Sequence, residues 1–279
     1  MITGIGGVRV GHWTDERART GCTVVLLPDG TVAGGEVRGG APATREFELL
    51  DAHRTVGRLD AVVLAGGSAF GLAAADGVMR WCEEQGSGFP TAAGPVPIVV
   101  AMGLFDLMEG DGSVRPTAAN GYEAAAAAST DAAQSGRIGA GTGATVGKWL
   151  GRDHARPGGL GSASEVNGGL LVAALVAVNA VGDLPVPGVV RAPIAPTTNY
   201  ENTTLAVVVT NAKLTKLECS LAARAAHDGF ARALDPAHTA GDGDAVVVAA
   251  TGELDADPIA VPALAAVVVE EAIRAALRP

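Results

Sequence analysis

Thr203 marks the boundary between a polar segment and an apolar run. Residues 197–202 are rich in threonine and asparagine, whereas residues 204–209 are Thr-Leu-Ala-Val-Val-Val, which is typical of a buried strand. If the bond between Asn202 and Thr203 were cut, Thr203 would hold a hydroxyl nucleophile and a free α-amine. Such an amine has a pKa of about 7.7–8.0 and could take the hydroxyl proton at neutral pH. The same residues also fit a glycosylation sequon or an ordinary turn, so the local pattern alone does not show whether Thr203 is a nucleophile.

Three further polar side chains stand at the ends of predicted strands. Asn179 follows the apolar run 170–178, and we interpret it as a buried turn residue or as a polar group of a site. Asp242 and Asp244 precede a strand predicted at 245–250, and their spacing directs both carboxylates to one face. They could also belong to a turn or a calcium loop, but the spacing and the distal glutamate of an EF-hand are missing. We therefore predict no metal site.

A glycine-spaced loop covers residues 136–147 and ends at Lys148. It does not match G-x-G-x-x-G, and Gly-Lys-Trp replaces the Gly-Lys-Ser/Thr of a phosphate loop, which disfavours nucleotide binding. Alternatively, the glycines bring the backbone at Gly141 and Thr142 close to a substrate and hold Lys148 over it. Lys148 is the only lysine before position 203, although an isolated lysine is by default a solvated surface group.

Ser68 stands between a predicted strand at 60–64 and a predicted helix at 69–85. Two functional interpretations are open. One is a nucleophile elbow, but Phe70 stands where G-x-S-x-G requires its last glycine. The other is an anion site at a helix N-terminus, and we keep Ser68 as a substrate-binding candidate on this basis. The simpler interpretation is a tight glycine turn with Ser68 as the N-cap.

Other strands and helices must position these side chains. The turn signal Pro28-Asp29-Gly30 predicts that strands 22–27 and 31–37 form a hairpin. Thr44 is predicted to cap a helix at 45–53. The remaining predicted elements are strands at 8–13 and 97–100 and helices at 121–134, 213–234 and 262–277.

The composition indicates a globular protein with a large core. Of the 279 residues, 48% are hydrophobic, and no Pro/Ser/Gly linker divides the chain, so we expect one domain over residues 1–279. The net charge of −10 without a basic stripe argues against nucleic acid and anionic membranes. Cys22, Cys82 and Cys219 form no disulfide framework, and no signal peptide is visible, so we expect a cytoplasmic protein. The proline-rich residues 185–198 are expected to form a mobile surface loop.

Ordered motifs along nearly the whole chain resemble one family. It is the DmpA-like group of self-processing N-terminal-nucleophile aminopeptidases and amidases, which includes the β-aminopeptidases and the nylon-oligomer hydrolases. The strongest matches are Val178-Asn179-Ala180-Val181-Gly182-Asp183, Asn202-Thr203-Thr204-Leu205 and His238-Thr239-Ala240-Gly241-Asp242-Gly243-Asp244. Further matches are Gly7-Val8-Arg9-Val10-Gly11-His12, Thr20-Gly21-Cys22-Thr23-Val24, Ala65-Gly66-Gly67-Ser68-Ala69-Phe70-Gly71-Leu72, Gly139-Ala140-Gly141-Thr142-Gly143-Ala144-Thr145 and Gly159-Leu160-Gly161-Ser162.

The resemblance implies a layered αββα fold in which two stacked sheets are flanked by helices. It also implies a precursor that cuts itself into an α chain, residues 1–202, and a β chain, residues 203–279. The αβ protomers are expected to assemble into a homo-oligomer, a tetramer by the resemblance. No cofactor is implied.

The resemblance also assigns a role to each candidate residue. Thr203 matches the nucleophile, and Asn179 matches the residue that donates to the oxyanion. Lys148 matches a lysine found in the site of the nylon-oligomer hydrolase branch. The Asn202-Thr203 pair is also closer to that branch, because many peptidase members have serine after glycine at this position. Asp242 and Asp244 match the acidic or hydroxyl pair that positions the nucleophile and its amine.

These roles predict a hydrolase of small-molecule or peptide amides that works through an acyl-enzyme at Thr203. The alternatives are a non-catalytic relative and a protein that binds a phosphate or nucleotide through the glycine-rich loops. The substrate stays open among peptides, D-amino acid, β-amino acid and nylon-type amides. Glu123, Glu165 or neither could anchor a substrate amine.

Overall fold

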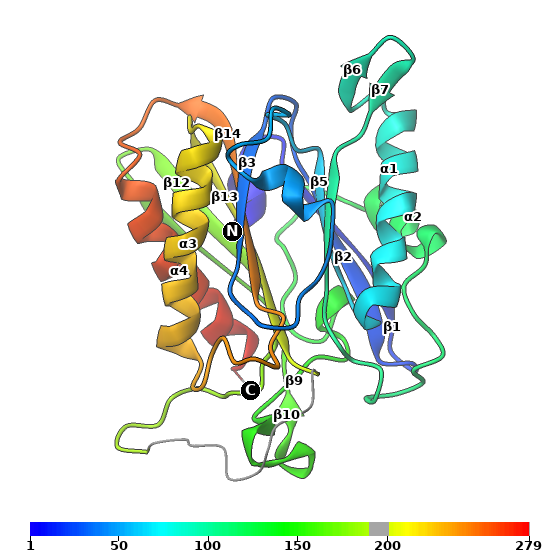
Figure 1. Cartoon of the computed structure of the whole chain (residues 1–279), viewed down its shortest axis with the longest axis vertical. Coiled ribbons are helices and arrows are strands. Elements are labelled where there is room, and N and C mark those ends of the chain that lie inside the picture. The colour runs from blue at the N-terminus through cyan, green and yellow to red at the C-terminus, as the bar shows by residue number, and fades with distance from the viewer. Residues whose placement is uncertain (190–200, 279) are drawn as a thin grey trace.

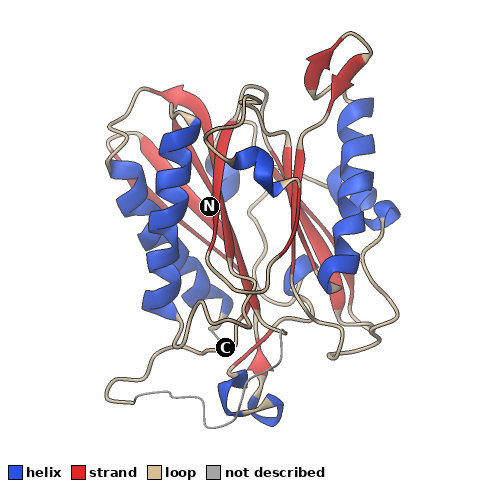
Figure 2. Cartoon of the chain, in the orientation of Figure 1, coloured by secondary structure: helices blue, strands red, loops and turns tan. Residues whose placement is uncertain are grey.

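Two five-stranded sheets lie face to face, and a pair of helices covers the outer face of each sheet (Figures 1 and 2). The computed structural model describes residues 1–189 and 201–278. It confirms the predicted αββα layering. Most of the loop predicted at 185–198 lies outside the described residues.

The first sheet has the strand order β1-β2-β5-β8-β4, and the second has the order β11-β12-β13-β14-β3. The strands of the first sheet are β1 (Arg9–Asp15), β2 (Thr20–Leu26), β5 (Ala61–Ala65), β8 (Val99–Gly103) and β4 (Ala43–Arg45). Those of the second are β11 (Gly159–Asn167), β12 (Leu170–Asn179), β13 (Thr203–Ala212), β14 (Ala245–Leu254) and β3 (Val32–Val37). The order places β13 and β14 in the interior of the second sheet, between β12 and β3.

Helices α1 (Ala74–Glu84) and α2 (Ala118–Ala126) cover the first sheet, and α3 (Lys216–Ala233) and α4 (Ala260–Ala276) cover the second (Figure 1). Short elements complete the chain. They are the strand pairs β6 (Phe89–Thr91) with β7 (Gly94–Val96) and β9 (Thr145–Val146) with β10 (Arg156–Pro157), and the 3-10 turns η1 (Ile2–Gly4), η2 (Phe47–Leu50), η3 (Ser68–Ala73), η4 (Gly139–Gly141), η5 (Lys148–Leu150) and η6 (Arg152–His154).

The valine-rich strands of the second sheet are buried on both faces because each face meets a different apolar layer. In β13, Leu205, Val207 and Val209 belong to the core between the two sheets, whereas Ala206 and Val208 belong to the core under α3 and α4. This alternation follows the two-residue period of a strand. A side chain at position 203 has the parity of Leu205 and is therefore directed toward the space between the sheets.

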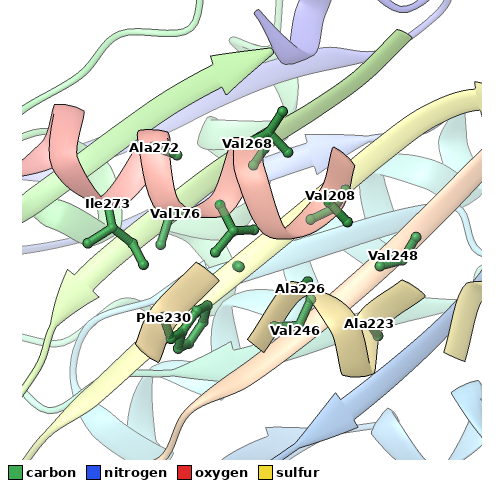
Figure 3. Close-up of a cluster of buried hydrophobic side chains, with 14 of the residues drawn as sticks. Val176, Val208, Ala223, Ala226, Phe230, Val246, Val248, Val268, Ala272 and Ile273 are labelled. Atoms are coloured by element: carbon green, nitrogen blue, oxygen red, sulfur yellow. The ribbon is translucent and has the colours of Figure 1, made fainter. Parts of the chain in front are cut away.

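The helix layer of the second sheet has its own apolar core (Figure 3). Phe230 of α3 is fully buried there and is the largest side chain of that core. Helix α3 begins at a capping box, in which Thr215 accepts from Glu218 N–H and the Glu218 carboxylate accepts from Thr215 N–H. Truncation of a fully buried phenylalanine to alanine costs about 3–5 kcal/mol, so this core fixes the sheet that carries Thr203.

The predicted hairpin of residues 22–27 and 31–37 is wrong. Strand β2 pairs with β1 and β5, whereas β3 pairs with β14 in the other sheet. The turn at residues 28–30 passes the chain from one sheet to the other, and Leu27 N–H donates to Asp60 at 3.0 Å. At Gly34 of β3, a Cβ would lie 2.4 Å from the backbone nitrogen of Ser220, so this strand is fitted to the surface of α3. Pairing between distant strands overrides the local turn signal.

Two predicted helix starts are also wrong. Thr44 lies in β4, and Glu46 with φ of 58° ends that strand before the short turn η2. Ser68 has φ of 54° and makes no capping hydrogen bond, so the chain enters α1 through η3. The helix predicted at 121–134 is the shorter α2, because Ser129 exchanges backbone hydrogen bonds with Val10 of β1.

No helix in the described part of the chain has the length and apolar character needed to cross a membrane.

Candidate active site

Thr203 and Asn179 lie opposite each other at the ends of two central strands. Strand β13 begins at Thr203, β12 ends at Asn179, and the two residues are direct partners in the antiparallel ladder. Thr203 is 5% exposed and Asn179 is fully buried. Both side chains have the parity of residues that face the core between the sheets, so the second sheet directs both toward the same space.

The carbonyl oxygen of Asn202 accepts two hydrogen bonds. The Thr203 hydroxyl donates to it at 2.5 Å, and the backbone N–H of Gly243 donates at 2.8 Å. An N–H aimed at an oxygen that gains negative charge during nucleophilic attack is the arrangement of an oxyanion hole. A Cβ at position 243 would lie 2.7 Å from the Thr203 hydroxyl oxygen, so a glycine is required for this approach. The sequence analysis did not assign a role to Gly243, whose only signal was its place between two aspartates.

The side-chain amide of Asn179 is fixed on both sides. Its oxygen accepts from Thr145 N–H at 2.9 Å and from the Lys148 ammonium at 3.1 Å. Its nitrogen donates to the carbonyls of Phe105 at 2.9 Å and Glu201 at 3.1 Å. In the uncut chain this amide therefore holds the carbonyl one residue before that of Asn202.

Lys148 is buried, in contrast to the default expectation of a surface lysine. It is 7% exposed, and its Nζ lies 3.2 Å from the Asn179 carbonyl and 3.4 Å from the Glu201 carbonyl. Burial, together with the nearby Arg152 guanidinium, lowers the pKa of Lys148 to about 7. Gly147, with φ of 79°, turns the chain so that Lys148 enters the site. A lysine with such a pKa can exchange a proton near neutral pH.

Asp242 lies beside the Asn202 carbonyl, because its residue forms a parallel bridge with Asn202. Its carboxylate accepts from Thr239 N–H at 2.9 Å, from the Thr239 hydroxyl, and from Val181 N–H at 3.4 Å. Burial and then the neighbouring Asp244 raise the pKa of Asp242 to about 6. The backbone of Asp242 thus lies beside Asn202, while its carboxylate is held by Thr239 and Val181.

Asp244 binds the residue after the nucleophile. One carboxylate oxygen accepts from Thr204 N–H at 2.7 Å, and the other accepts from His238 N–H at 3.1 Å and lies 2.8 Å from His238 Nδ1. His238 has φ of 55°, and its ring packs against those of His227 and Phe230 at 4.7 and 5.3 Å between centroids. The sequence analysis did not assign a role to His238, although it stands in the same motif as the two aspartates.

The three tentative substrate-binding residues lie outside this group of contacts. Thr142 turns its hydroxyl to the Gly139 carbonyl at 2.6 Å, and a Cβ on Gly141 would lie 2.4 Å from Leu160 N. The loop glycines therefore permit close backbone packing. Ser68 donates its N–H to Leu104 at 2.8 Å.

The two acidic residues considered as amine anchors are also separate from the Thr203 region. Glu123 is exposed on α2, over the first sheet. Glu165 pairs with Val172 of β12, near the opposite end of that strand from Asn179. Among the described residues, no group of three or more His, Cys, Asp or Glu side chains is arranged to hold a metal ion.

Comparisons with known proteins place the chain in a family. The model of peptidase family S58 matches residues 1–278. An uncharacterized aminopeptidase of Mycobacterium tuberculosis (strain ATCC 25618 / H37Rv) is 44% identical, over 94% of this chain and 85% of the relative. A 6-aminohexanoate-oligomer endohydrolase of Kocuria sp. (strain KY2) is 29% identical, over 89% of this chain and 74% of the relative.

Solved structures show the same fold. A Burkholderia sp. beta-aminopeptidase is similar with a TM-score of 0.76 and 27% identity, over 99% of this chain and 85% of that chain. The L-aminopeptidase D-Ala-esterase/amidase of Ochrobactrum anthropi, described as a variant of the Ntn hydrolase fold, has a TM-score of 0.76 over 99% of this chain and 85% of that chain. Its identity of 22% supports the fold alone.

Proposed function

This chain belongs to peptidase family S58, and from that premise we propose that it cuts itself between Asn202 and Thr203 and then hydrolyses amide bonds with the new N-terminal threonine. The observation that carries the proposal is the Asn202 carbonyl, which is held between the Thr203 hydroxyl and the Gly243 N–H. Nucleophile and oxyanion donor thus already meet at one carbonyl in the uncut chain.

In the first reaction, the Thr203 hydroxyl oxygen bonds to the carbonyl carbon of Asn202. Its proton passes to a base, and the Gly243 N–H stabilises the developing oxyanion. The C–N bond then breaks as the nitrogen of Thr203 takes a proton, which leaves an ester. Water hydrolyses this ester into an Asn202 carboxylate and the free Thr203 hydroxyl, next to the α-amine that cleavage of the C–N bond has already released. No α-amine is free before the cut, so we assign the first base to Lys148. Its ammonium lies against the Asn179 amide and the Glu201 carbonyl, one residue before Asn202, and its pKa of about 7 makes the neutral amine available.

In the second reaction, the same hydroxyl attacks the carbonyl of a substrate amide. The free α-amine of Thr203 takes the hydroxyl proton and passes it to the leaving amine. The acyl group stays on Thr203 until water releases it. Gly243 supplies an N–H on the side on which the oxyanion forms. We assign Asn179 to the same oxyanion by its match to the family, although in the uncut chain its amide nitrogen donates to the Glu201 carbonyl. Asp242 and Asp244 hold the chain around Thr203.

The substrates are amides of peptides or of non-peptide oligomers. The similarity to an aminopeptidase supports the first class, and the similarity to a 6-aminohexanoate-oligomer hydrolase supports the second. Lys148 and the Asn-Thr pair favour the second branch.

We also propose a cytoplasmic homo-oligomer, a tetramer by its resemblance to the family. Cys22, Cys82 and Cys219 are buried free thiols, which suits a reducing compartment. Native mass measurement would test the number of copies.

The test of the cut is an intact mass under denaturing conditions. We expect wild type to give two chains, residues 1–202 and 203–279, and Thr203→Ala to give one. Thr204→Ala is the matched control, since its buried hydroxyl has no hydrogen-bond partner among the described residues, and it should still be cut. A single chain in wild type, or a cut in Thr203→Ala, would overturn the proposal.

A further inference from the structure

A charged network includes Glu201, which stands two residues before the proposed nucleophile. The Glu201 carboxylate pairs with one nitrogen of the Arg152 guanidinium at 3.0 Å, and the other nitrogen pairs with Glu109 at 2.6 Å. Arg19 donates to the Glu109 carbonyl at 3.1 Å. The reaction steps derived above give these four residues no role.

This network borders a hollow of about 240 Å³, whose lining includes Arg19, Glu109, Thr145, Arg152 and Arg156. Thr145 joins the hollow to the active site, because its N–H donates to the Asn179 amide at 2.9 Å and its hydroxyl donates to Glu109 at 3.3 Å.

The charges of the hollow favour an anion. Arg156 is paired with Asp183, with Nε at 2.7 Å from a carboxylate oxygen. Of the remaining charges, Arg19 and Arg152 are cationic and Glu109 is anionic. Glu201 supplies the second carboxylate in the uncut chain. If Glu201 left this position, Arg152 would be free to bind another carboxylate there.

Self-cleavage and substrate hydrolysis place the same kind of carbonyl at the same atoms. In both reactions the carbonyl carbon must meet the Thr203 hydroxyl, and its oxygen must meet the Gly243 N–H. In self-cleavage, the acyl group that carries this carbonyl is Asn202, with Glu201 before it. In substrate hydrolysis, the acyl part of the substrate takes the place of these two residues. The path of residues 201 and 202 is therefore the path open to a substrate acyl chain.

The contacts of Glu201 describe what this path binds. Its carbonyl accepts from the Asn179 amide and lies within reach of the Lys148 ammonium, and its carboxylate binds Arg152. We propose that the mature enzyme prefers amides whose acyl part carries a carboxylate one residue before the scissile carbonyl, and that Arg152 binds this carboxylate. This inference rests on the proposed function and names its substrate class.

The test compares two substrates that differ only in charge, acetyl-Glu-Asn-p-nitroanilide and acetyl-Gln-Asn-p-nitroanilide. We expect kcat/KM of wild type to be about tenfold higher for the glutamate substrate, a modest factor because Arg152 is 29% exposed. Arg152→Gln should remove this preference, and Arg152→Lys should retain part of it. Arg274→Gln is the matched control, since it removes a carboxylate-paired arginine of 38% exposure from α4.

The outcomes separate the two proposals. A wild type that remains uncut and hydrolyses neither substrate contradicts the proposed function. A wild type that is cut and hydrolyses both substrates equally contradicts only the role of Arg152, as does a preference that survives in Arg152→Gln.

If Arg152→Gln fails to fold or to cut itself, or if the cut protein turns over neither substrate, calorimetry on cut wild type decides. Acetyl-Glu-Asn should then bind about tenfold more tightly than acetyl-Gln-Asn, by the same charged contact. Equal affinities would overturn the inference.

Discussion

Asp106 and Asp242 are both almost fully buried, and burial raises the pKa of each carboxyl group to about 6. Asp106 follows β8 of the first sheet, where it accepts from Gly67 N–H at 2.6 Å and from the Thr20 hydroxyl at 2.8 Å. Asp242 precedes β14 of the second sheet, and its residue bridges to Asn202. Asp106 thus ties strand ends together, whereas Asp242 lies at the proposed cut.

The difference teaches that a raised pKa marks burial rather than catalysis. Both groups have desolvation as the first cause of the shift. Only the Asp242 region also has a nucleophile and an N–H aimed at the same carbonyl. The Asp106 region contributes indirectly, because the neighbouring Phe105 carbonyl binds the amide of Asn179.

The largest expected effect is on the rate of self-cleavage when Lys148 is replaced, in comparison with a lysine that has only a structural role. Lys148→Met should slow self-cleavage about 10²–10⁴-fold, the usual contribution of general acid–base catalysis. In wild type the rate should rise as pH increases through about 7, because only the neutral amine of Lys148 accepts a proton. A time course of cut chain by denaturing mass spectrometry, after cell-free synthesis at several pH values, measures both.

Lys216→Met is the control for this test. Lys216 also has its pKa lowered by burial, but its ammonium binds the carbonyls of Leu49, Arg54 and Val56. We expect it to be cut at the wild-type rate. An unchanged rate in Lys148→Met would remove Lys148 from the reaction.

The next contrast uses two glycines. Gly243→Ala would place a Cβ 2.7 Å from the Thr203 hydroxyl oxygen and should slow the cut about 10²-fold, as misplacement of a reacting group does. Gly143→Ala would place a Cβ 1.9 Å from the Arg19 carbonyl and 2.8 Å from Asp106, far tighter than normal packing. It should lower the free energy of unfolding by about 1–3 kcal/mol and leave the cut in place.

Urea unfolding in the uncut Thr203→Ala background and the cleavage time course would measure the two glycine variants side by side. If Gly243→Ala were cut as fast as wild type, the N–H contact to Asn202 would have no part in the reaction.

Asp106 and Asp242 allow a third contrast, in which each is replaced by asparagine. Both replacements should change how the free energy of unfolding depends on pH, and only one should change the rate of self-cleavage. Both folded-state pKa values lie above the ordinary 3.8, so the folded chain holds these protons more tightly than the unfolded chain. The stability contribution of each group therefore falls as pH rises from about 4 to about 6, by on the order of 1–3 kcal/mol.

Asp106→Asn and Asp242→Asn should each flatten this dependence in urea unfolding at pH 4.5 and 7.5. Only Asp242→Asn should also slow the cut, by about tenfold or more, because only Asp242 adjoins the reacting carbonyl. Equal cleavage rates in the two variants would erase the contrast between the regions.

The smallest expected effect comes from the hydroxyl donors. Thr20 donates to Asp106 and Thr239 to Asp242, so Thr20→Val and Thr239→Val each remove one hydrogen bond from a buried carboxylate. Each should lower the free energy of unfolding by about 0.5–1.5 kcal/mol, the net value of one hydrogen bond, because each carboxylate keeps its other donors. Only Thr239→Val should move the pH profile of the cut. Loss of a donor raises the pKa of Asp242 further, and a neutral Asp242 no longer raises the pKa of Lys148, so the profile should move toward lower pH. An identical profile in both variants would contradict this.

The strands that carry the site were predictable because their valine-rich composition strongly favours buried strands. The valine-rich runs of β12, β13 and β14 are buried on both faces, and their boundaries differ from prediction by only a few residues. The hairpin at residues 22–37 was not predictable from its turn, because β2 and β3 find their partners far along the chain.

The site was predictable only in part. Resemblance singled out Asn179, Lys148, Thr203, Asp242 and Asp244, and the structure brings the elements that carry them together. The roles proposed for Gly243 and Arg152 depend on where a backbone N–H and a guanidinium point. Such directions are set by tertiary packing and leave no periodic pattern in the sequence.

The strand order of the second sheet has a consequence for the molecularity of folding. Residues 203–279 supply β13 and β14, and residues 1–202 supply β12 on one side and β3 on the other. A cut at residue 203 would therefore leave two chains joined by a ladder on each flank, and neither chain could leave without breaking both. Unfolding of the cut protein would become a dissociation, and its melting temperature would depend on protein concentration.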